Sequence, residues 1–216
     1  MTVKSYSQCG EDRIVSFLLG CIGHHAPITY LDLGCAHPIS HNNTYLFYEY
    51  GSRGVLVEAD PKYSELYKQA RPADIHESAA IVPEARYTGQ SARFYISGDA
   101  GWSTIVESHA QLAVAHGKGS TKAIVDVPTT TLHRLVGRHL RNRPLHLLSV
   151  DVEGLDIEIL QDVGRDGVQP WIIVAENNGG VPVHLETMRQ RKYTHWATTN
   201  VNSVYVADDV LSQAKF

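Results

Sequence analysis

The sequence predicts an α/β fold in which helices cover both faces of a mostly parallel sheet of seven strands. Three observations predict it. Apolar runs alternate with amphipathic stretches over residues 28–207, a pattern typical of strands separated by helices. Runs such as LHLLSVDV and WIIVAE are apolar almost throughout, as strands buried on both faces are. Only residues 200–202 separate the last two apolar runs, which favours an antiparallel hairpin at the end of the chain.

The strands are expected at residues 28–33, 54–58, 74–76, 145–152, 171–176, 194–199 and 203–207. The helices between them are expected at residues 43–50, 62–70, 129–140 and 155–163. Thr129 or Thr130 is expected to cap the helix at 129–140. A length of 216 residues with 43% hydrophobic and 19% charged residues is typical of one globular domain, so residues 1–216 are expected to form a single domain.

Composition excludes several classes of protein. The formal net charge of -4 leaves no surplus of basic residues for a nucleic-acid backbone, so no nucleic-acid partner is expected. No apolar run approaches the roughly 20 residues of a membrane helix, and the first residues lack the apolar centre of a signal peptide, so we expect a cytoplasmic protein without a membrane span. Three cysteines without a CxxC pair argue against a disulfide framework or a zinc site.

Acidic residues and a glycine end the first two predicted strands. Asp32 and Gly34 follow the first strand, where a glycine lets the backbone approach a ligand closely. The segment after Gly34 lacks the GxGxxG glycines that hold a dinucleotide pyrophosphate, so a cofactor without phosphates is favoured over a nicotinamide dinucleotide. Glu58 ends the second strand, where a carboxylate can accept hydrogen bonds from both ribose hydroxyls. The alternative for Glu58 is an ordinary exposed acid before the turn at Asp60.

Further polar residues follow the next predicted strands. Glu77 and Ser78 come after the third strand, where they would border an adenine. Asp151 and Glu153 end a buried strand beside the start of a helix, and Glu176 ends the next strand. These three carboxylates are candidate catalytic groups, either as acceptors of a hydroxyl proton or, for Asp151 and Glu176, as ligands of a divalent cation such as Mg²⁺ or Mn²⁺. Capping of the following helix remains the structural alternative for Asp151 and Glu153.

Three blocks of sequence, in order, carry a resemblance to a known family. They are SYSQCGEDRIV, YLDLGCAHPISHNNTYLFYEYGSRGVLVEADP and LHLLSVDVEGLDIEIL, and the later strand QPWIIVAEN agrees with them. Together they resemble the FkbM-type methyltransferase family over nearly the whole chain. The resemblance implies a Rossmann-like methyltransferase fold, S-adenosyl-L-methionine as cofactor, and methyl transfer to hydroxyls of sugars, glycans or secondary metabolites.

The resemblance also implies roles for individual residues. It makes residues 1–27 an N-terminal helical segment or lid, with Glu11 and Asp12 in its opening block. Asn42 and Ser52 depart from the family, which often has serine and tryptophan at these positions, and they put acceptor recognition in doubt. The candidate cofactor-binding residues are Gln8, Asp32, Gly34, Cys35, Ala36, Asn43, Thr44, Glu58, Ala59, Glu77, Ser78 and Asp151.

The sequence therefore predicts an O-methyltransferase for a small-molecule or glycan acceptor. A non-catalytic cofactor-binding or assembly subunit with the same fold is the alternative. A nicotinamide-dependent oxidoreductase is disfavoured by the missing phosphate-binding glycines. A homo-oligomer remains open.

Overall fold

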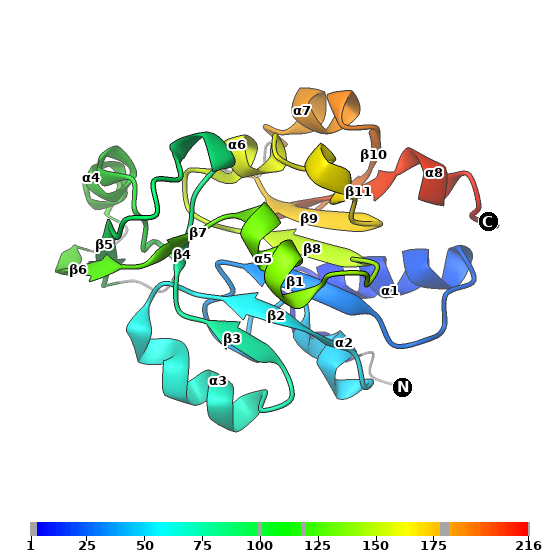
Figure 1. The fold of residues 1–216 in the computed structure, drawn as a ribbon, viewed down its shortest axis with the longest axis horizontal. Helices are drawn as coiled ribbons and strands as arrows, with labels where there is room; N and C mark the ends of the chain where they lie inside the picture. The colour runs from blue at the N-terminus through cyan, green and yellow to red at the C-terminus, as the bar shows by residue number, and fades with distance from the viewer. Residues whose placement is uncertain (1–3, 99–100, 118–119, 178–181, 216) are drawn as a thin grey trace.

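The computed structural model describes residues 4–98, 101–117, 120–177 and 182–215. In these residues the main sheet has seven strands, in the spatial order β10-β11-β9-β8-β1-β2-β3. Figure 1 shows this sheet through the middle of the molecule. The strands are β1 (Thr29–Leu33), β2 (Arg53–Val57), β3 (Ile75–Glu77), β8 (Leu147–Val150), β9 (Ile172–Glu176), β10 (Tyr193–Thr198) and β11 (Asn202–Ala207).

The pairing of these strands confirms the predicted architecture. β3, β2, β1, β8 and β9 run parallel to one another, whereas β11 runs antiparallel to both β9 and β10. Every residue of β1 and β8 is buried, because both strands lie in the centre of a sheet that is covered on both faces. The carboxyl ends of β1, β2, β8 and β9 therefore meet at one edge of the sheet.

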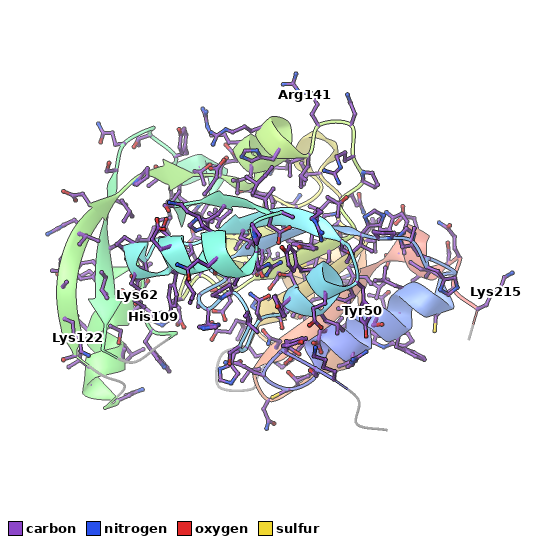
Figure 2. The ribbon with its side chains drawn as sticks, turned by 90° about the horizontal axis from the view of Figure 1, so that it is seen from below. Tyr50, Lys62, His109, Lys122, Arg141 and Lys215 are labelled. Atoms are coloured by element: carbon purple, nitrogen blue, oxygen red, sulfur yellow. The ribbon has the colours of Figure 1, made fainter. Side chains whose placement is uncertain are left out.

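Helices lie on both faces of this sheet. Figures 1 and 2 show α1 and α5 on opposite sides of it. The helices are α1 (Glu11–Cys21), α2 (Tyr45–Glu49), α3 (Ser64–Ala70), α5 (Leu132–His139), α6 (Asp156–Leu160), α7 (Leu185–Gln190) and α8 (Asp208–Leu211). No helix of the described ranges is long and apolar enough to cross a membrane.

A second, smaller unit interrupts the alternation of strands and helices. It contains the antiparallel pair β5 (Ala92–Ser97) and β6 (Thr121–Val127), the helix α4 (Glu107–Ala115), and the short parallel pair β4 (Ala80–Ile81) and β7 (Thr129–Thr130). Figure 1 shows β5, β6 and α4 projecting from one side of the main sheet. The sequence analysis did not predict this unit, because β6 is exposed on most of its length and lacks a strongly apolar face.

The structure corrects one predicted boundary with a clear physical reason. The helix expected at residues 129–140 begins at Leu132, and Thr131 caps it by accepting a hydrogen bond from the Arg134 backbone N–H. Thr129 and Thr130 cannot cap it, because they pair with β4 as a strand. The third strand also begins and ends one residue later than the predicted 74–76.

The N-terminal segment is fastened to the end of the chain. Glu11 of α1 is fully buried, and its carboxylate accepts hydrogen bonds from the Thr199 hydroxyl (2.6 Å) and the Asn202 amide (3.1 Å) in the β10–β11 turn. The Asp12 carboxylate accepts from the Tyr6 backbone N–H at 2.7 Å. Glu11 thus ties α1 to the β10–β11 hairpin, whereas Asp12 fixes the residues that precede α1.

Candidate functional site

A pocket of about 660 Å³ lies at the edge of the sheet where β1, β2 and β8 end. The small unit of β5 and α4 contributes its far wall. Its lining residues are Gly34, Ala36, Val57, Glu58, Ala59, Asp60, Lys62, Tyr63, Ala79, Ala80, Ile81, Phe94, Gly101, Ser103, Ile105, Asp151, Val152 and Glu153.

The turn after β1 forms the floor of the pocket. Gly34 has a φ of 74°, and its backbone N–H donates to the Val57 carbonyl at 2.9 Å. A Cβ at this position would lie 1.7 Å from the Asp151 carbonyl oxygen. Only glycine satisfies both the left-handed backbone and this contact between the ends of β1 and β8.

Glu58 is held rigidly in one wall of the pocket. Its side chain is buried, and its two carboxylate oxygens accept hydrogen bonds from the backbone N–H groups of Ala36 (2.8 Å) and Asp60 (2.7 Å). Burial raises the pKa of Glu58 to about 7, although these two hydrogen bonds favour the charged form. Each oxygen keeps a further lone pair, so the carboxylate can accept hydrogen bonds from two hydroxyl groups of a ligand.

The wall beyond Glu58 is apolar. Ala79, Ala80 and Ile81 follow β3, and Phe94 and Ile105 approach from the small unit. At the rim the Lys62 ammonium pairs with the Asp60 carboxylate at 2.6 Å. The apolar slot suits the adenine of an adenosyl group. The adjacent carboxylate suits its ribose, because it can accept hydrogen bonds from the ribose hydroxyls.

Three carboxylates form a cluster at the pocket, and two of them, Asp151 and Glu153, line it. Asp151, Glu153 and Glu176 each offer an oxygen, and these oxygens lie within 4.8 Å of one another. Burial and mutual repulsion raise the pKa of Asp151 well above its usual value and that of Glu176 to about 8. Asp151 and Glu176 are also hydrogen-bonded to each other. The pair therefore retains at least one proton near neutral pH.

The backbone of Glu153 is strained, and a histidine contacts its carboxylate. Its φ of 54° is left-handed, which is uncommon for a residue with a side chain and typical of functional sites. The carboxylate lies 3.3 Å from Nε2 of His109 on α4, and this contact raises the pKa of the imidazole. A Cβ at Gly154 would lie 2.8 Å from Nδ1 of His109, so glycine makes room for the ring.

The loop that carries Glu153 is fixed from two sides. The buried Thr104 hydroxyl donates to the Glu153 carbonyl at 2.6 Å. The Asp156 carboxylate accepts from the backbone N–H groups of Val152 (3.0 Å) and Gly154 (3.2 Å). The Asp156 side chain thus fixes the loop that precedes α6, and the start of α6 itself has no side-chain cap hydrogen bond.

The structure brings half of the predicted residues to the pocket. Gly34, Ala36, Glu58, Ala59 and Asp151 line it together with Glu153. Glu176 stands beside them in the carboxylate cluster.

Four further predicted residues lie beneath the pocket and support it. The buried Asp32 carboxylate accepts from the Thr44 hydroxyl at 2.7 Å, and the Asn43 amide donates to the Ser149 hydroxyl at 3.1 Å. The buried Cys35 thiol contacts the Tyr67 hydroxyl at 2.8 Å. These side chains do not line the pocket, because they fix the loop after β1 to the sheet.

Three predicted residues lie away from the pocket. Glu77 pairs with Arg138 at 2.6 Å and with His139, and Ser78 is also outside the lining. The pocket is instead bordered by the residues after Ser78, since β3 ends later than predicted. The Gln8 side chain is exposed and does not line the pocket.

Sequence reasoning missed Phe94, which lines the pocket, and His109, which contacts Glu153. No motif marks these two residues, because their position depends on how the β5–β6 unit folds back onto the main sheet. Asp60, Lys62 and Tyr63 also line the pocket. Sequence reasoning could have included these three residues, because they closely follow Glu58.

Comparison with known proteins identifies the family. The profile of the methyltransferase FkbM domain matches residues 25–194. Among solved structures, the chain is similar to the 1,6-didemethyltoxoflavin-N1-methyltransferase of Burkholderia thailandensis, crystallised with 1,6-didemethyltoxoflavin and S-adenosylhomocysteine. The two share 10% sequence identity with a TM-score of 0.42, over 92% of this chain and 77% of that chain. No curated protein matches the chain in sequence. The profile match spans most of the sequence and confirms the resemblance seen in its motifs, so the chain belongs to the FkbM family of S-adenosylmethionine-dependent methyltransferases.

Proposed function

We propose that this protein transfers a methyl group from S-adenosylmethionine to a hydroxyl oxygen of a small sugar, glycan or secondary-metabolite acceptor. The observation that carries this proposal is the polarity of one pocket. The fixed Glu58 carboxylate and an apolar slot line it together with Asp151 and Glu153, which belong to a cluster of three carboxylates.

The first half of the pocket fits the cofactor. Glu58 would accept the hydrogen bonds of the ribose hydroxyls, and the two backbone N–H groups that hold it keep the carboxylate in place without the cofactor. Ala80, Ile81 and Phe94 would enclose the purine ring. When bound, S-adenosylmethionine supplies an electrophilic methyl group on its sulfonium sulfur.

The second half supports proton removal from an acceptor hydroxyl. Transfer to oxygen requires that the O–H proton leave, and ionised Glu176 can accept it because its pKa is raised to about 8. Glu153, oriented by His109, adds an acceptor for a neighbouring hydroxyl. Several carboxylates around one position favour an acceptor that carries several hydroxyl groups, which is the argument for a sugar-like molecule.

The same three carboxylates have the donor chemistry of a site for Mg²⁺ or Mn²⁺. A cation there would lower the pKa of an acceptor hydroxyl, in place of proton removal by a carboxylate. Chelator treatment distinguishes catalysis by a bound cation from catalysis by a carboxylate base. Loss of activity with recovery on added Mg²⁺ or Mn²⁺, together with a melting temperature that these ions raise in the wild type but not in Glu176→Gln, supports the cation. Turnover that is indifferent to chelator supports the carboxylate base.

The decisive experiment is a turnover assay with S-adenosylmethionine and a panel of monosaccharides, oligosaccharides, polyhydroxylated metabolites and amines. The expected result is S-adenosylhomocysteine formation with a hydroxylated acceptor and a methyl group located on oxygen by mass spectrometry. Methylation confined to amines contradicts the O-transfer proposal. Cofactor binding without turnover on any acceptor favours the non-catalytic alternative.

A further inference from the structure

The outer edge of β6 is an unpaired strand edge on the surface of the small unit. Within the described residues β6 pairs only with β5. Its other edge therefore presents backbone N–H and C=O groups that are available to another strand. The strand is seven residues long, and the Ile124 side chain at its centre is 52% exposed.

One face of β6 packs against an apolar cluster of the small unit. Only the side chains on the other face can therefore contact a partner. Val125 and Val127 alternate towards the small apolar cluster that contains Phe94 and Ala80. Lys122, Ile124 and Asp126 point to the opposite face, the one that α4 covers in part. Figure 2 shows Lys122 at the edge of this unit.

The sequence of β6 is complementary to itself when two copies run antiparallel. A two-fold axis through Ile124 sets Ile124 opposite Ile124, and it sets Lys122 of each copy opposite Asp126 of the other. Opposite charges in directly facing positions stabilise a strand pair. No ion pair occupies Lys122 or Asp126 in the described part of the chain, so both charges are available.

We propose that this protein forms a homodimer in which the β6 edges of two copies pair antiparallel about Ile124, joining two β5–β6 ribbons into one four-stranded sheet. The pairing satisfies the free backbone groups of both edges and places two Lys122–Asp126 pairs symmetrically on either side of the Ile124 contact. Such an isologous interface closes on itself and leaves no further β6 edge for a third copy.

Exposed apolar groups on α4 extend the surface. Val114 is 47% exposed and lines the small cavity between α4 and the ribbon together with Thr121, at the start of β6. Because the two-fold axis keeps both α4 helices on the same face of the joined sheet, Val114 and Ile124 contribute apolar area beside the paired strands. This dimer is independent of the methyl-transfer proposal, because no pocket-lining residue lies on β6.

Charge reversal and its rescue test the dimer. Sedimentation velocity is measured from about 1 µM to about 100 µM protein, the range in which modest interfaces dissociate. We expect the wild type to shift from monomer to dimer and Lys122→Glu to remain monomeric, because the substitution sets Glu opposite Asp126. The double variant Lys122→Glu with Asp126→Lys restores the facing pairs and should restore the dimer. The control Arg141→Glu changes an exposed charge elsewhere on the surface (Figure 2) and should dimerise like the wild type.

Hydrogen exchange gives a second readout. Backbone amides of residues 121–127 should exchange more slowly at high protein concentration in the wild type and in the double variant, but not in Lys122→Glu. A wild type that stays monomeric over the whole range overturns the proposal. A dimer that survives Lys122→Glu, or that the double variant fails to recover while its circular dichroism is unchanged, also overturns it.

Discussion

The turn at Gly34 packs directly against the backbone of Asp151, so that the end of β1 supports the residue at the centre of the carboxylate cluster. A Cβ on Gly34 would lie 1.7 Å from the Asp151 carbonyl oxygen and 2.7 Å from its carbonyl carbon. Both atoms belong to backbone and cannot rotate away. The floor of the proposed cofactor pocket and the proposed catalytic cluster therefore share one packing contact.

Gly34→Ala should damage folding and cofactor binding together. The added methyl group must displace the end of β8, and alanine is strained at a φ of 74°. We expect a loss of about 2 to 4 kcal/mol in the free energy of unfolding, measured by urea denaturation. Gly137→Ala is the matched control, because Gly137 lies in α5 with open space around it. That variant should gain about 0.5 to 1 kcal/mol. Equal stability of the two variants would show that the β1–β8 contact is unimportant.

Glu58 should make cofactor binding depend on pH. Its pKa of about 7 means that the free carboxyl is mostly protonated at pH 6 and mostly ionised at pH 8. Ribose hydroxyls donate to the ionised form, so the affinity for S-adenosylhomocysteine should increase as the pH rises through 7. Glu58→Gln should weaken binding by about 10- to 100-fold and abolish this dependence. Calorimetry at the two pH values measures both effects, and an unchanged pH dependence in Glu58→Gln would assign it to another group.

The Asp151–Glu176 pair should make the fold less stable as the pH rises. The pKa of Glu176 is raised from its usual 4.5 to about 8, so between these values the folded protein binds more protons than the unfolded chain. The free energy of unfolding contributed by this group is therefore highest below pH 4.5 and falls as the pH increases to about 8. Relative to the wild type, Glu176→Gln should gain about 1 to 2 kcal/mol over this range, a value reduced for the partial exposure of the side chain. Urea denaturation at pH 5 and pH 8 measures this difference, and a constant difference between the two proteins would argue against the retained proton.

Asp151→Asn should reduce turnover more than binding. The substitution removes the carboxyl group that is hydrogen-bonded to Glu176 and through it alters proton transfer, but it keeps the size of the side chain and the backbone contact with Gly34. We expect kcat to fall about 100-fold, within the range for loss of a general base, and the Kd for S-adenosylhomocysteine to change little. Single-turnover kinetics and calorimetry separate the two effects. An equal loss in both measurements would place Asp151 in cofactor binding alone.

His109 should act through the orientation of Glu153. His109→Gln removes the contact between Nε2 and the carboxylate, and we expect turnover to fall about 10-fold with unchanged cofactor binding. The pKa of His109 is raised by Glu153, so the imidazolium form that stabilises this contact is lost as the pH rises, and the ratio of wild-type to variant turnover should decrease in alkaline solution. His116→Gln alters an exposed residue at the end of the same helix and should have no effect. A pH-independent ratio would leave His109 with a packing role only.

The sequence predicted the main sheet and the strand ends, because strands buried on both faces produce apolar runs that are easy to recognise. Asp151, Glu153 and Glu176 each follow such a run, and their meeting at one edge follows from parallel strands in neighbouring positions. Gly34 was predicted in the same way, because it directly follows the apolar run of the first strand.

The remaining part of the site depends on packing that no local pattern encodes. His109 was one of twelve scattered histidines, and its contact with Glu153 arises from the fold of the β5–β6 unit and from the space left by Gly154. Asp32 and Thr44 stand in a motif that suggests ligand contact, yet the structure buries them in hydrogen bonds to each other. A motif identifies the loop, whereas packing decides which of its side chains reach the pocket.

The most direct measurement is calorimetric titration of S-adenosylhomocysteine into the wild type, Glu58→Ala and Glu65→Ala at pH 8. Glu65 is exposed on α3 and provides a carboxylate control outside the pocket. We expect saturable binding to one site in the wild type and in Glu65→Ala, and affinity weakened about 100-fold or more in Glu58→Ala. Absence of binding by the folded wild type at about 1 mM ligand, or identical affinity in all three proteins, would contradict the proposal that this pocket holds the cofactor.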